Sequence, residues 1–142
     1  MKSKLLVIVA ACGGLLSAVA PVLAHHSFAA VFDSAKRGLI KGAITKVDWR
    51  NPHMYLYVDV TGPDGTVANW ACETFPPNVL VRQGWKKDAL KVGDPVTISG
   101  TLAKDGTNLM FIAEVTFPDG SKRLGGARPT ADGTAPDPNY KQ

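Results

Sequence analysis

The sequence predicts an all-β fold, a small five-stranded OB-like barrel with one short helix between strands 3 and 4. Apolar residues alternate with other residues over several short runs, and turn-forming residues separate these runs. One short segment alone carries helix start and stop signals. The chain has 142 residues, of which 45% are hydrophobic and 20% charged. This is the composition of one globular domain, and the length excludes a two-domain enzyme.

The first two predicted strands lie at residues 38–49 and 53–60, separated by Asn51 and Pro52. In the second strand, the alternation places two sets of side chains on opposite faces. The set expected to face the core is Met54, Leu56, Val58 and Val60, and the outward set is His53, Tyr55, Tyr57 and Asp59.

Turn signals then separate the remaining predicted elements. An Asp-Gly turn precedes a third strand at 66–74, and a second Asp-Gly pair separates the strands at 95–103 and 109–117. The helix follows Pro76 and Pro77, with Asn78 as its expected cap, and ends at Gly84.

Two flanking segments complete the predicted domain organisation. The barrel domain is expected at 37–119, after an arm at 25–36 that has no clear period. The segment 120–142 is nearly devoid of large apolar residues, so it is expected to be a flexible tail.

Residues 1–24 have the layout of a secretory signal peptide. Lys2 and Lys4 precede an apolar run that ends in small residues, with cleavage expected after Ala24. This predicts a periplasmic or secreted protein with no membrane span once the signal is removed. The alternative is lipid anchoring through Cys12, which a loose lipobox precedes.

The charge and the motifs of the chain exclude several function classes. The formal charge of +4 includes Lys2 and Lys4, so the mature chain is too weakly basic to predict a nucleic-acid partner. Loss of Cys12 leaves Cys72 as the one mature thiol, which excludes an intramolecular disulfide. The sequence has no phosphate-binding glycine loop, nucleophile elbow or Cys-x-x-Cys pair.

The three histidines predict a metal site. Cleavage after Ala24 would start the mature chain at His25, whose amine and ring nitrogen can chelate one ion, with His26 beside it. His53 could add a remote nitrogen, and three nitrogens in a T shape suit Cu(II). The competing interpretation is that all three are ordinary polar residues of an arm and a strand start.

A second candidate site is aromatic. Tyr55 and Tyr57 on an outward strand face, with Trp49 and Trp70, could bind a small aromatic or sugar ligand. The alternative is ordinary cross-strand packing of aromatic side chains.

Two neighbouring residues of the third predicted strand have open roles. Cys72 is expected to be a small buried residue, and the alternative is a thiolate ligand of Cu(I). Glu73 is expected to form an ion pair with a basic residue such as Arg82, and the alternative is to support a metal-binding histidine.

Several sequence blocks resemble a known family. They are His25-His26-Ser27-Phe28, Trp49-x-Asn51-Pro52-His53, Trp70 with Glu73, Arg82-x-Gly84-Trp85 and Lys104-Asp105-Gly106. The mature chain resembles the exported bacterial proteins of domain-of-unknown-function family 6152. The resemblance implies a small periplasmic β-barrel whose signal is removed just before His25. It implies no activity, and it places the three histidines, but not Cys72, within the family blocks.

These observations lead to three functional hypotheses. The first is a non-enzymatic binding protein that carries copper or delivers it to an exported metalloenzyme. The second is a small-ligand or protein-interaction module that uses the tyrosine face and needs no metal. The third, ranked below both, is a copper-dependent oxidative enzyme, for which so small a domain offers little substrate surface.

Overall fold

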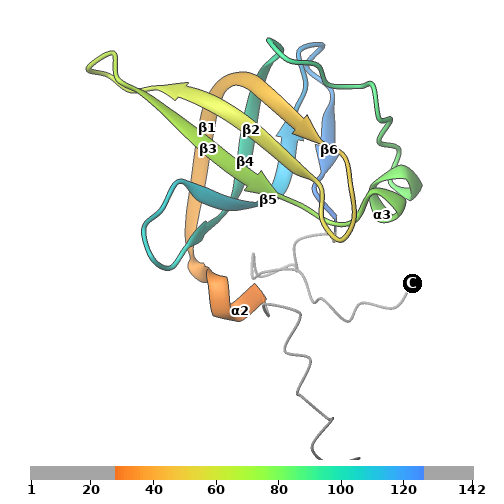
Figure 1. Ribbon diagram of the computed structural model, residues 1–142, viewed down its shortest axis with the longest axis horizontal. Helices are drawn as coiled ribbons and strands as arrows, with labels where there is room; N and C mark the ends of the chain where they lie inside the picture. The colour runs from red at the N-terminus through yellow and green to blue at the C-terminus, as the bar shows by residue number, and fades with distance from the viewer. Residues whose placement is uncertain (1–27, 127–142) are drawn as a thin grey trace, which may run out of the picture.

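The alternating runs form β-strands in the computed structural model, which describes residues 28–126 of the chain. Within this range, six strands and two short helices make up a mostly β structure (Figure 1). In chain order the elements are α2 (Phe28–Val31), β1 (Phe32–Asp48), β2 (Tyr55–Thr61), β3 (Val67–Glu73), α3 (Pro77–Arg82), β4 (Pro95–Ala103), β5 (Leu109–Thr116) and β6 (Lys122–Leu124). The predicted signal peptide at 1–24 lies outside the described residues.

The strands form one sheet in the order β3-β2-β1-β4-β5-β6, with antiparallel neighbours. In addition, β3 pairs in parallel with β5, through Ala71–Glu73 and Leu109–Phe111. The pairings of β1, β2, β3, β5 and β4 therefore form a ring, and β6 is added to the free edge of β5.

The long strand β1 makes this ring of pairings possible. Its first half pairs with β4 and its second half pairs with β2, and Figure 1 shows it arching over the structure. The register with β2 shifts between Ile44 and Lys46, where an extra residue bends the strand. Gly42 lies beside this bend, and a Cβ there would overlap the backbone of Asp59.

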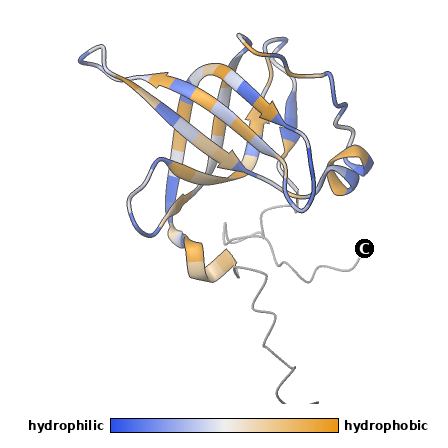
Figure 2. Cartoon of the chain, in the orientation of Figure 1, coloured by the Kyte–Doolittle hydropathy of each residue, from blue (hydrophilic) through white to orange (hydrophobic). Residues whose placement is uncertain are grey.

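The inner side of the sheet is the apolar core. Hydrophobic and hydrophilic residues alternate along the strands in Figure 2. Met54, Leu56 and Val58 are fully buried, as expected, while Val60 is partly buried against the core. Trp85 follows α3 and is 3% exposed. Its indole N–H donates to the carbonyl of Leu124 at 2.8 Å, which satisfies the polar atom of a buried ring.

The structure corrects the expected N-terminal arm. Residues 25–36 were expected to be an arm with no clear period, and the described part of this range contains α2 at Phe28–Val31 and the start of β1 at Phe32. Phe32 is 3% exposed and pairs with Ala103 of β4. The segment lacks a period because the buried ring of Phe32 is followed by a run of exposed residues. This pattern matches neither helix nor strand templates.

The structure also corrects the expected start of the tail at residue 120. Lys122–Leu124 form β6, a sixth strand beside the five that were expected. The carbonyl of Gly125 accepts a hydrogen bond from the hydroxyl of Thr74, and that of Gly126 accepts one from the side-chain amide of Gln83. Hydrogen bonds to its own backbone carbonyls hold this segment in place. Its lack of large apolar residues therefore gave no sign that it is ordered.

The expected cap of the short helix is wrong in one detail. Helix α3 begins at Pro77, where the fixed φ of proline suits the first turn, and no side chain caps it. Asn78 is already the second residue of the helix and is exposed. The expected stop at Gly84 agrees with its φ of +87°, which favours glycine.

Candidate functional site

The main polar contact on the outer side of the sheet joins His53 and Glu73. His53 precedes β2 and Glu73 ends β3, so the pairing of the two strands brings both to the same end of the sheet. Nδ1 of His53 faces Oε1 of Glu73 at short hydrogen-bonding range. The side chains are 37% and 13% exposed respectively, so the histidine ring reaches solvent while the carboxylate is largely covered.

Tyr55 is the third member of this polar cluster. It is the direct cross-strand partner of Glu73, and its hydroxyl hydrogen-bonds to that carboxylate. Burial, this hydrogen bond and the charge of Glu73 raise the pKa of Tyr55 well above its usual range. Glu73 therefore lies between two ring-bearing side chains of the β2 segment.

Tyr57 continues the outer face next to this cluster. Its ring stacks on that of Tyr55, with centroids 6.2 Å apart and an interplanar angle of 24°. The ammonium group of Lys46 lies 5.0 Å from the centre of the Tyr57 ring, which is a cation–π contact. The two tyrosines predicted to point outward thus stack on each other, and Glu73 links Tyr55 to His53.

The two predicted tryptophans lie apart from this surface. Trp49 and Trp70 are partly buried and pack against the core. Trp70 is the cross-strand partner of Val58, whose side chain is fully buried, so its ring lies on the opposite face from Tyr57. The structure does not bring the four aromatic residues together as one site.

Cys72 also lies on the inner side. It is fully buried, and burial raises the pKa of its thiol to about 12. The neutral thiol is therefore the favoured form, and its position is that of a small core residue. This agrees with the expected burial of Cys72 and gives no support to a thiolate ligand.

The expected ion pair between Glu73 and Arg82 is wrong, because the partner of Glu73 is His53. The alternative role, support of a histidine, is the one that the geometry matches. Arg82 is an exposed residue in the last turn of α3. Charge alone did not distinguish the two partners, and the signal that could have done so is the pairing of the strands that carry His53 and Glu73.

An aromatic cluster lies beside the His53–Glu73 pair, and the sequence analysis did not identify it. Phe111 is the β5 partner of Glu73. Its ring contacts those of Phe28, Phe32 and Phe75 edge to face, with centroids 5.2–5.5 Å apart. Phe28 is the first described residue, so the cluster brings the described N-terminal end close to Glu73.

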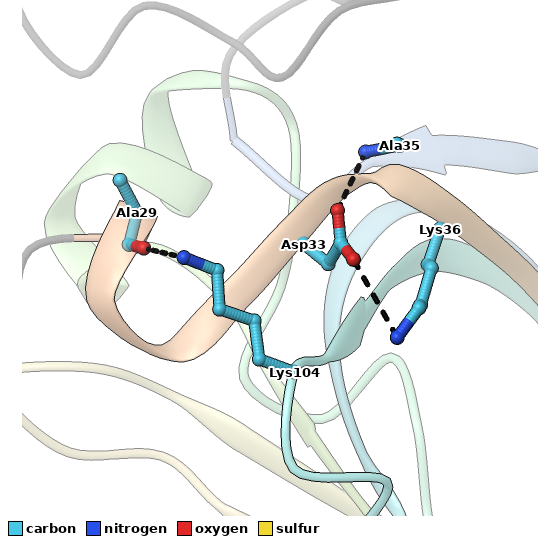
Figure 3. A network of polar contacts seen from close by, with 5 residues as sticks. All are labelled: Ala29, Asp33, Ala35, Lys36 and Lys104. Atoms are coloured by element: carbon cyan, nitrogen blue, oxygen red, sulfur yellow. Dashed lines mark hydrogen bonds and ion pairs between the residues drawn. The ribbon is translucent and has the colours of Figure 1, made fainter.

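Lys104 adds polar contacts to the same N-terminal segment (Figure 3). Its ammonium group donates to the carbonyl of Ala29 at 2.5 Å, and its backbone N–H donates to that of Val31 at 2.9 Å. One residue of the β4–β5 turn thus satisfies two carbonyls of α2. At the start of β1, Asp33 accepts a hydrogen bond from the backbone N–H of Ala35 at 3.1 Å and pairs with Lys36 at 3.5 Å.

The described residues alone do not complete a metal site. No group of three or more metal-ligating side chains occurs within residues 28–126. His25 and His26, the other predicted ligands, lie outside the described residues, as does Cys12. His53 is therefore the predicted ligand whose surroundings can be described, and Glu73 occupies its Nδ1 side.

Comparison with known proteins identifies a family of unknown function, DUF6152, whose model matches residues 11–110. No curated protein and no solved structure gives a significant match. In the part of the chain that the structure describes, no helix is long and apolar enough to span a membrane.

Proposed function

The chain belongs to this family of unknown function, DUF6152, and we propose that it is an exported, non-enzymatic protein that binds one copper ion. The proposed ligands are His53 on the sheet and His25 at the mature N-terminus, with His26 beside it. The domain that presents them is proposed to be an OB-like barrel, which the ring of pairings among β1–β5 supports. Its role would be carriage of copper or delivery to an exported metalloenzyme.

The observation that carries the proposal is the contact between Glu73 and Nδ1 of His53. An ionised carboxylate only accepts hydrogen bonds, so the ring nitrogen that faces it carries the proton. The lone pair then resides on Nε2, which is the nitrogen able to bind a metal. Metal-binding histidines commonly have this partner, because it fixes the orientation of the ring and raises its basicity.

The position of Phe28 supports participation of the N-terminal histidines. Its ring lies 5.2 Å from that of Phe111, the strand partner of Glu73. His25 precedes Phe28 by three residues, a stretch that spans up to about 10 Å when extended. Phe111 lies on the strand that pairs with Glu73, and paired strands are about 4.8 Å apart, so the described chain starts near the carboxylate that contacts His53.

The set of donors favours copper over other metals. An amine and two imidazoles are nitrogen ligands of intermediate softness, and copper has the highest affinity of the divalent first-row ions. A chelate from His25 with one remote imidazole gives the planar arrangement that Cu(II) prefers. The buried Cys72 offers no thiolate to select Cu(I).

The test is a competition titration of the mature protein, purified from the periplasm of a bacterial host, with Cu(II) and a chelator of known affinity. Replacing His53 with Ala should lower the copper affinity by about 100-fold or more, since loss of a direct ligand costs at least as much as loss of its outer partner. Tyr57→Phe, on the same face and without a ligand role, should leave the affinity unchanged. Equal affinities of the wild type and His53→Ala would contradict the proposal.

A second candidate function uses the tyrosine surface without metal. The stacked rings of Tyr55 and Tyr57 favour a ligand that stacks on an aromatic ring, such as an aromatic compound or a sugar. This function predicts that Tyr57→Ala abolishes ligand-induced quenching of tyrosine and tryptophan fluorescence, while removal of metal changes nothing. A ligand response that Tyr57→Ala leaves intact would contradict it.

A further inference from the structure

One half of strand β3 has a free backbone edge. This strand pairs with β2 along its whole length, but it pairs with β5 only over Ala71–Glu73. Within residues 28–126, no strand pairs with Val67–Trp70 on the side away from β2. Figure 1 shows this half of the β2–β3 hairpin reaching beyond the rest of the sheet. Its free edge is therefore available to another extended chain.

The hydrogen bonds beside this edge show which backbone groups it presents. The N–H of Ala71 donates to the carbonyl of Asn108 at 2.9 Å, on the side away from β2. The backbone groups of an antiparallel pair turn alternately toward the partner strand and away from it. Those of Asn69 and Val67 therefore point the same way as the N–H of Ala71. Each of these two residues adds one donor and one acceptor to the edge.

The edge also lacks the features that usually prevent the addition of a strand. Exposed edges commonly carry lysine or proline, and the edge strand β6 has Lys122 and Arg123. The open half of β3 has no charged residue and no proline. The side chain of Val67 is 59% exposed, and Trp70 on the opposite face is partly buried. An added strand would therefore cover apolar side chains as well as main-chain groups.

We propose that the Val67–Trp70 edge of β3 binds an extended, basic peptide segment of a partner protein by strand addition. Main-chain hydrogen bonds to Val67 and Asn69 would hold the added strand. Its alternate side chains would face Trp70 on one side and the outer side of the sheet on the other. The interface is independent of the proposed copper site, because Glu73 lies at the other end of β3.

The charge of the hairpin sets the chemical class of the partner. The chain has no Lys, Arg or His between Met54 and Val81, a stretch that contains three carboxylates. Asp59 is the strand partner of Asn69 and accepts a hydrogen bond from its side-chain amide at 2.7 Å, while Asp64 lies in the turn. No cation among residues 28–126 forms an ion pair with either carboxylate. A basic segment would supply the complementary charge.

The test follows the NMR amide signals of the isotopically labelled mature protein during titration with a blocked hexapeptide in which lysine and valine alternate. The signals of Val67 and Asn69 should shift on binding, and their exchange with solvent should slow. A matched peptide with glutamate in place of lysine should bind at least about tenfold more weakly, because its charge repels Asp59 and Asp64. Asp59→Asn should weaken binding of the lysine peptide about threefold, the effect of one charge pair near the surface. Equal affinities for the two peptides would overturn the basic class of the partner.

Two controls test whether the backbone edge is the contact. The lysine–valine peptide with every backbone nitrogen methylated has no main-chain donors and should not bind the wild type. Val67→Pro removes an N–H that points away from β2, so the hairpin keeps its pairing while peptide binding is lost. Val67→Ala keeps this N–H and should retain most of the binding. Binding of the methylated peptide, or unchanged binding by Val67→Pro, would overturn strand addition.

A second copy of the chain is the other strand that could occupy the edge. Sedimentation of the mature protein at several concentrations detects such a dimer. A dimer that Val67→Pro abolishes, in a protein that does not bind the lysine–valine peptide, would contradict the basic partner and assign the edge to self-association. A monomer that binds the peptide through the amides of Val67 and Asn69 would support the proposal.

Discussion

Each side of the sheet at β2 and β3 carries one candidate copper ligand, Cys72 on the inner side and His53 on the outer side, and the two sides differ in what they can do. The inner side holds Leu56, Val58 and Cys72, all fully buried. The outer side holds His53, Tyr55 and Glu73, whose polar atoms contact each other and whose histidine reaches solvent. Cys72 and Glu73 are adjacent in the chain, yet they point to opposite sides of β3.

This difference shows that residue type alone does not make a ligand. A thiolate is a strong copper ligand, but burial keeps the Cys72 thiol protonated. An imidazole is a weaker ligand, but the carboxylate of Glu73 contacts Nδ1 of the His53 ring, whose side chain reaches solvent.

Truncation of the inner side should affect stability and not copper binding. Leu56→Ala removes a fully buried side chain and should lower the free energy of unfolding by about 2–5 kcal/mol. Val67→Ala, at a position that is 59% exposed, should change it by less than about 0.5 kcal/mol. Urea denaturation measures both values, and a loss below about 1 kcal/mol for Leu56→Ala would show that this side is not the core.

Loss of the carboxylate on the outer side should affect copper binding more than stability. Glu73→Gln keeps the size of the side chain but weakens the acceptor for His53, so copper affinity should fall by about 10–100-fold. Glu114→Gln is the matched control, because Glu114 is a strand glutamate that pairs with Lys122 instead. Chelator competition gives both affinities, and identical values for the two variants would remove Glu73 from the site.

Alkaline pH should reveal the buried thiol. Burial raises the pKa of the Cys72 thiol from its usual 9.0 to about 12, so between these two values the thiol ionises in the unfolded chain and not in the folded one. Stability is therefore fully present below pH 9 and decreases as pH rises from 9 towards 12, by about 1.4 kcal/mol at pH 10. Urea unfolding at pH 8 and pH 10 measures the free energy of unfolding of the wild type and of Cys72→Ala. The wild type should lose more stability between the two pH values than the variant, and equal losses would contradict the burial of the thiol.

The smallest expected effect concerns the Tyr55 hydroxyl. Tyr55→Phe removes one of the two donors to Glu73 and should cost about 0.5 kcal/mol of stability. Tyr57→Phe should cost less, because its ring contacts involve no hydroxyl. Thermal unfolding of the two variants makes the comparison, and a larger loss for Tyr57→Phe would contradict the assigned role of Tyr55.

The sequence was sufficient to predict the strands that have one face on the core and one face outward. The period of two in residues 54–60 and the Asp-Gly turns define β2, β3, β4 and β5 to within a few residues. The predictions were wrong for the segments that are held by contacts distant in sequence. Lys104 holds α2, and the side chains of Thr74 and Gln83 hold the segment after β6.

The candidate site could be predicted only in part for the same reason. His53, Tyr55 and Tyr57 were identified because they share the outward set of one strand. The pairing of Glu73 with His53 depends on the register between β2 and β3, in which Tyr55 lies opposite Glu73. The contact of Phe28 with Phe111 depends on the parallel pairing of β3 with β5, which no short-range pattern reports.

The most direct test of the central claim is electron paramagnetic resonance of the mature protein loaded with one equivalent of Cu(II). Pulsed spectra detect the remote ring nitrogen of each coordinated imidazole. We expect signals from two imidazoles on one ion in the wild type, and the loss of one of them in His53→Ala. A wild-type spectrum with a single imidazole, unchanged by His53→Ala, would contradict the claim that the N-terminus and the sheet bind the same copper ion.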